Sequence, residues 1–141
     1  MIGRLAALGM ALSAAPATAG GVQSFCDELD RVVRAGTEKP SFASLEHARD
    51  ITWLTFDSPC HVLDDALGRR FICSQSMAPV PLNQAALDRA TAQCLPAAER
   101  RVDGELGDVL FRLGAVRIRI IERGTPEGHI GRQVYYVVTR D

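Results

Sequence analysis

The sequence has little net charge, few aromatic residues and a single lysine. Its 141 residues include 16 basic and 17 acidic side chains, and aromatic residues make up 6%. This near-neutral balance argues against a nucleic-acid-binding chain, which carries a basic excess, and against an acidic tail protein. The hydrophobic share of 47% excludes an intrinsically disordered chain, because it supplies enough apolar surface for a core. The length fits one domain.

The familiar catalytic and cofactor-binding motifs are also absent. The sequence contains no Gly-x-Ser-x-Gly motif, no Gly-x-x-x-x-Gly-Lys phosphate loop, no His-Glu-x-x-His motif and no calcium loop. Its four cysteines include no Cys-x-x-Cys pair, which argues against a structural zinc site, where ligands usually come in close pairs. We therefore expect no cofactor, no metal and no catalytic residue.

The first nineteen residues have the pattern of a secretory signal peptide. Arg4 supplies one positive charge, apolar and small residues fill 5–15, and an Ala-x-Ala cleavage pattern ends at Ala19. The apolar stretch is shorter than the roughly 20 residues that a transmembrane helix needs. We predict a signal peptide over 1–19 and a single exported domain over 20–141, periplasmic or extracellular, without a stable membrane anchor after cleavage.

Hydrophobic periodicity predicts two helices. Apolar residues recur at helical spacing over 24–35, with Ser24 as an N-cap and Gly36 at the position of a C-cap glycine. The second helix is expected over 82–95, between flanking prolines. Its inner line consists of Leu87, Ala90, Thr91 and Cys94.

A predicted hairpin places two of the cysteines opposite each other. Residues 60–63 and 69–74 pair across a four-residue loop, 65–68, and counting outward from the loop sets Cys60 opposite Cys73. Directly opposed residues of an antiparallel pair have Cβ atoms about 4.5–5.5 Å apart, which is close to disulfide reach. We therefore expect a Cys60–Cys73 bridge.

The second bridge is then Cys26–Cys94. It joins the start of the first helix to the end of the second, and antiparallel helices lying side by side would bring those ends together. Four cysteines allow three connectivities, and the hairpin register favours this one. An even cysteine count in a small exported domain is typical of a disulfide-stabilised protein.

A second hairpin has the clearest turn signal in the sequence. Strands over 108–113 and 116–121 flank Gly114 and Ala115, with glycine first as a type II′ turn requires. The register puts six apolar residues on one face, in the opposed pairs Leu113–Val116, Phe111–Ile118 and Val109–Ile120.

The remaining segments complete an α+β fold. Strands are expected over 51–56 and 132–140, one helical turn near Phe42–Leu45, and a charged, exposed connector over 97–106. Strands joined by hairpins imply an antiparallel sheet. We predict two helices packed on one face of an antiparallel sheet of about five or six strands, stapled by the Cys60–Cys73 and Cys26–Cys94 disulfides.

The other face of the second hairpin carries the residues that are the strongest candidates for a functional role. Arg112 lies opposite Arg117, with Arg119 diagonally nearby, and like charges directly opposite repel by up to about 1 kcal/mol. Residues 20–106 hold nine basic and thirteen acidic side chains, whereas 107–141 hold six and four. An acid on a neighbouring strand, solvent screening or an anionic partner would offset the repulsion.

The leading hypothesis is a small exported, non-catalytic binding or accessory protein. The three arginines form its partner-binding face, and the partner is an acidic protein or an anionic envelope polymer, not nucleic acid. One alternative is a small secreted hydrolase that uses His61 or His129 with a nearby residue such as Asp57 or Ser58. Another is a structural component of the cell envelope.

Overall fold

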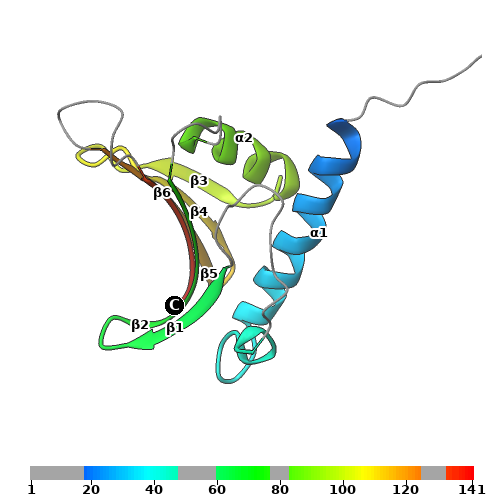
Figure 1. Cartoon of the computed structure of the whole chain (residues 1–141), viewed down its shortest axis with the longest axis vertical. Coiled ribbons are helices and arrows are strands. Elements are labelled where there is room, and N and C mark those ends of the chain that lie inside the picture. The colour runs from blue at the N-terminus through cyan, green and yellow to red at the C-terminus, as the bar shows by residue number, and fades with distance from the viewer. Residues whose placement is uncertain (1–17, 48–59, 77–82, 125–132) are drawn as a thin grey trace, which may run out of the picture.

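The computed structural model describes residues 18–47, 60–76, 83–124 and 133–141. Within these residues, two helices, a 3-10 turn and six strands follow one another (Figure 1). In order, the elements are α1 (Thr18–Gly36), η1 (Ala43–Leu45), β1 (His61–Asp65), β2 (Gly68–Ser76), α2 (Gln84–Cys94), β3 (Glu99–Val102), β4 (Val109–Leu113), β5 (Val116–Arg123) and β6 (Gln133–Arg140). The strand predicted over 51–56 lies outside the described residues.

The six strands form one antiparallel sheet in the order β1-β2-β6-β5-β4-β3. Both helices lie on the same side of this sheet, and the sheet curves away from them (Figure 1). The predicted α+β architecture is therefore confirmed. Neither helix in the described part of the chain combines the length and apolar composition that a membrane span requires.

The core lies between the helices and the sheet, because every strand alternates its side chains between the two faces. The buried face of the second hairpin carries the apolar pairs predicted above, and their register is confirmed. Phe25 from α1 packs edge-on against Tyr136 from β6, with ring centroids 6.2 Å apart. The Tyr136 hydroxyl and the Thr91 hydroxyl of α2 form a buried hydrogen bond of 2.8 Å. Burial raises the pKa of Tyr136, so its hydroxyl remains protonated.

Both predicted disulfides are present. Cys60 and Cys73 have Cα atoms 4.3 Å apart, and Cys26 and Cys94 have Cα atoms 5.1 Å apart. The predicted arrangement of the helices is wrong, however. Figure 1 shows that α2 meets α1 at a steep angle instead of lying alongside it. The predicted start of the first helix is also wrong: α1 begins at Thr18, before the predicted N-cap, so Cys26 lies near the middle of α1, whereas Cys94 is the last residue of α2. A disulfide needs contact at a single point, which this packing provides.

Two local predictions also need correction. Asp65 pairs with Gly68, so the first hairpin turns through two residues and not four, and Gly68 has a positive φ of 97° that suits this tight turn. Part of the predicted connector over 97–106 is the edge strand β3, which pairs with β4 although all four of its residues are exposed. An edge strand is held by backbone hydrogen bonds, so its side chains need no apolar alternation.

Gln75 is a polar exception on the buried face of β2. Its side chain is 2% exposed, and within the described part of the chain neither its amide nitrogen nor its amide oxygen has a hydrogen-bond partner. Burial of an unsatisfied polar group costs about 1–3 kcal/mol. We expect Gln75→Met to raise the free energy of unfolding by about 1–2 kcal/mol, as measured by urea denaturation.

The matched control for this prediction is Thr91→Val, which removes a buried polar group that is hydrogen-bonded. It should lower the free energy of unfolding by about 1 kcal/mol. A loss of stability in Gln75→Met comparable to that of the control would show that the Gln75 amide makes a stabilising interaction.

Candidate functional site

The candidate site is the face of the sheet that points away from both helices, called the open face below. Strand pairing aligns its residues in two rows that cross all six strands. The first row consists of Leu63, Arg70, Thr139, Arg117, Arg112 and Glu99; the second consists of His61, Ile72, Val137, Arg119, Leu110 and Arg101. Each row mixes cationic with apolar side chains.

Curvature of the sheet turns the open face into a groove with a volume of about 570 Å³. Five of the arginines that line it belong to the two rows: Arg70, Arg101, Arg112, Arg117 and Arg119. Glu99 is the acidic residue among the described residues of the lining. The groove therefore combines a concave shape with a local excess of positive charge.

The arginine face predicted from the sequence forms the centre of this groove. Arg112 and Arg117 are directly opposed on β4 and β5, as expected. Asp141, which follows β6, offsets their repulsion: its carboxylate lies 2.6 Å from Arg117 Nε and 3.3 Å from the Arg112 guanidinium. Of the three ways considered for balancing these charges, an acidic side chain beside the hairpin is therefore present.

The third predicted arginine lies close to a buried carboxylate. Asp108, at the start of β4, has a fully buried side chain that accepts two hydrogen bonds, of 2.7 and 3.2 Å, from Arg123. Arg119 lies 3.8 Å from the same carboxylate. This carboxylate ties the start of β4 to the end of β5 through Arg123, which is a structural role, and it also forms an ion pair with Arg119 of the groove.

Arg70 and Arg101 also belong to the site, and sequence reasoning missed both. Arg70 makes two hydrogen bonds, of 2.7 and 3.1 Å, to Asp65, and these bonds lower the pKa of the Asp65 carboxyl. Arg101 is exposed and has no hydrogen bond or ion pair in the described part of the chain. The alternation of apolar and polar residues in β2 could have placed Arg70 on the open face. The four residues of β3 are all exposed, so its burial pattern does not alternate and could not have placed Arg101.

Apolar side chains lie among the arginines across the groove. Leu110, Ile121 and Val137 are half-buried in its floor, and Leu67 stands at its rim with 85% of its surface exposed. A ligand seated in the groove would therefore meet both guanidinium donors and aliphatic surface. Guanidinium groups present planar arrays of donors that match carboxylates and phosphates.

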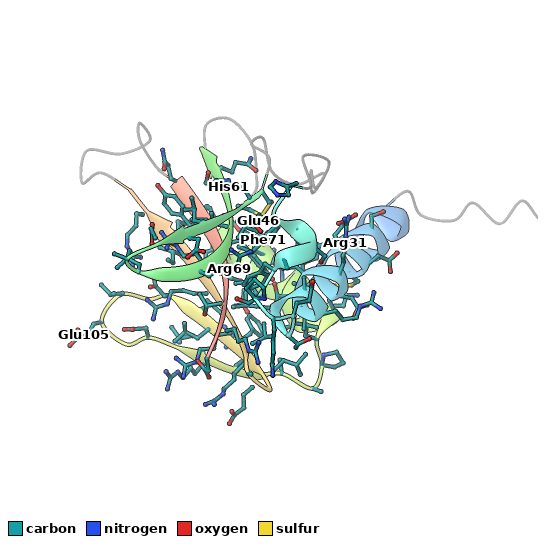
Figure 2. All side chains as sticks on the ribbon, turned by 90° about the horizontal axis from the view of Figure 1, so that it is seen from below. Arg31, Glu46, His61, Arg69, Phe71 and Glu105 are labelled. Atoms are coloured by element: carbon teal, nitrogen blue, oxygen red, sulfur yellow. A yellow bond between two sulfur atoms is a disulfide. The ribbon has the colours of Figure 1, made fainter. Side chains whose placement is uncertain are left out.

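The histidines do not form a site in the described part of the chain. His61 is exposed at the β1 edge of the sheet (Figure 2), whereas Asp57, Ser58 and His129 lie outside the described residues. Arg69 of β2 points to the other face, where it binds Glu46 (3.1 Å), Asp64 (3.2 Å) and the Ser41 carbonyl. No group of three or more metal-ligating side chains occurs among the described residues.

Comparisons with protein-family models, curated proteins and solved structures give no match for this chain. Its chemistry is therefore interpreted from the groove alone. The open face offers hydrogen-bond donors and apolar contacts on a rigid sheet. These are the components of a binding surface for an anionic ligand.

Proposed function

We propose that this chain is an exported binding protein, without catalysis, whose open face binds an acidic and partly apolar segment of another protein. The observation that carries the proposal is the groove across the sheet, which contains both arginines and aliphatic side chains. Basic surfaces raise the local concentration of acidic partners and orient them before contact.

Charge on the open face supports an anionic partner. Arg70, Arg112, Arg117 and Arg119 have carboxylates within 4 Å, but Arg101 has none in the described part of the chain. Arginines also outnumber carboxylates there. Among the described residues, the arginines are Arg70, Arg101, Arg112, Arg117, Arg119 and Arg123, and the carboxylates are Asp65, Glu99, Asp103, Asp108 and Asp141.

The distribution of these charges favours a polymer over a small anion. Arg70 on β2 and Arg101 on β3 are separated by four strand spacings, or roughly 19 Å at about 4.8 Å each. An extended polypeptide covers that distance with about six residues. Aliphatic side chains between the cations favour a polypeptide over a polysaccharide, because a polypeptide offers apolar side chains in return.

Two features support export. Both disulfides are formed in the structure, and disulfides persist in oxidising compartments such as the periplasm and the extracellular space. The first nineteen residues also have the composition of a signal peptide. We propose that the domain acts outside the cytoplasm, after cleavage near Ala19.

The test is binding of a fluorescent glutamate–tyrosine copolymer, measured by anisotropy at an ionic strength of about 0.15 M. The triple variant Arg112→Gln/Arg117→Gln/Arg119→Gln should bind at least about tenfold more weakly, because each lost guanidinium removes a charge-assisted contact. The matched control, Arg31→Gln/Arg34→Gln/Arg89→Gln, makes the same change in net charge on exposed helix positions. It should bind within about twofold of the parent protein.

Three outcomes would overturn the proposal. One is no binding of the copolymer, and another is equal weakening by the two triple variants, which would indicate attraction by net charge alone. The third is tighter binding of polygalacturonate, an anionic polysaccharide without apolar side chains, which would identify an envelope polymer as the better partner.

A further inference from the structure

Asp141 occupies the centre of the groove in a manner that resembles a bound ligand. Its backbone N–H donates to the Ala115 carbonyl at 2.8 Å and so continues the pairing of β6 with β5 beyond the Arg140–Val116 pair. Its two carboxylate oxygens contact different strands, with Oδ1 on Arg117 and Oδ2 on Arg112. The space between these two arginines therefore has the size and the donors for one carboxylate.

We propose that Asp141 is an internal competitor, and that a carboxylate of the acidic partner takes its place between Arg112 and Arg117 on binding. This inference rests on the proposed function of the groove. It identifies the space between Arg112 and Arg117 as a carboxylate site. Asp141 then has the role of shielding these two arginines from anions in the solvent until the partner binds.

Exposure of this ion pair makes the exchange feasible. The Arg112 and Arg117 side chains are 56% and 55% exposed, and that of Asp141 is 32% exposed. Ion pairs at this level of exposure contribute little to folding stability. The backbone hydrogen bond of Asp141 does not depend on its carboxylate, so the side chain can rotate away while the strand pairing stays in place.

The other carboxylates near the groove are held differently. Asp108 is fully buried beneath Arg123, so its displacement would leave a buried cluster unpaired. Asp65 accepts hydrogen bonds from Arg70 and from the Leu67 backbone inside the first hairpin. Among the described carboxylates that form ion pairs with arginines of the open face, Asp141 is therefore the one that a partner can replace without disturbing a buried group or a turn.

The first test is binding of the same copolymer to Asp141→Asn, a change that keeps the backbone and removes the charge. Binding should become about fivefold tighter, because the copolymer no longer competes with a resident carboxylate. The control is Asp30→Asn, which makes the same charge change at an exposed α1 position paired with Arg34. It should change the affinity by less than about twofold, and neither variant should shift the urea midpoint appreciably.

The second test follows the exchange directly by NMR. In the parent protein, saturation with the copolymer should move the side-chain carboxyl ¹³C resonance of Asp141 to the position of an unpaired aspartate. In Asp141→Asn, the Arg117 Nε–Hε resonance should lose its wild-type position and regain it when the copolymer is added. An Asp141 carboxyl resonance that stays in place at saturation would overturn the displacement.

The two proposals fail in different ways. Loss of binding in the Arg112, Arg117 and Arg119 variant, together with unchanged or weaker binding in Asp141→Asn, would overturn the competitor role and leave the groove as the binding site. No binding of the copolymer to the parent protein and to Asp141→Asn would overturn both proposals.

Discussion

Reduction of the Cys26–Cys94 bridge is expected to lower the free energy of unfolding by about 4 kcal/mol. A disulfide acts mainly by restricting the unfolded chain, and the effect grows with the length of the loop that it closes. The two cysteines are 68 residues apart, so opening the bridge frees a large part of the chain. This bridge also joins the two helices, which make fewer contacts with each other than the paired strands do.

The measurement uses a variant that retains this bridge alone. Cys60→Ala/Cys73→Ala is denatured with urea in its oxidised and reduced forms, and the difference between the two unfolding free energies isolates the bridge from any loss of side-chain packing. The control, Cys26→Ala/Cys94→Ala, retains a bridge between residues 13 apart. Its oxidised and reduced forms should differ by only about 3 kcal/mol. A larger difference in the control would contradict the prediction.

The second large effect is expected at Phe42, which has both a strained backbone conformation and a buried aromatic ring. Its φ of 62° lies in the left-handed region, and its side chain is fully buried, 6.3 Å from the Phe71 ring between centroids. Its backbone N–H also donates to the Ala35 carbonyl at 2.7 Å. We expect Phe42→Ala to cost about 3–5 kcal/mol, since it empties a ring-sized space in the core.

Phe42→Gly should be less destabilising than Phe42→Ala by about 1 kcal/mol, although it removes one carbon more. A left-handed conformation costs an L-residue roughly 1–2 kcal/mol, whereas glycine adopts it without strain. The matched pair is Phe71→Ala and Phe71→Gly on β2, where glycine should be the worse substitution by about 0.5–1 kcal/mol. The free energies of unfolding of the four variants are measured by urea denaturation. If alanine is the less destabilising substitution at both positions, backbone strain at Phe42 is refuted.

Most of the local structure could be predicted from residues that are near one another in the sequence. The register of both hairpins follows from their turns, because the side-chain period of two allows a single alignment that buries the apolar face. The two disulfides follow from the first register and from the cysteine count. Arg112, Arg117 and Arg119 therefore had a predictable position on one face of a hairpin.

Other features depend on contacts between distant segments. β6 pairs with both β2 and β5, and hydrophobic alternation shows which face of a strand is buried but not which strands are neighbours. This pairing brings Arg70 to the face that carries Arg117. β3 was missed for a related reason, since its pairing depends on the exposed edge of β4 and not on its own composition.

The sequence by itself determined the presence of both helices, the two hairpin registers, the cysteine pairing and the cationic face of the second hairpin, because each depends on local periodicity or on a short turn. Only the tertiary structure decided that this face is concave, that Arg70 and Arg101 extend it, and that Asp141 lies between Arg112 and Arg117. The physical reason is that curvature and long-range strand order arise from packing of the whole sheet against two helices. No short segment contains that information.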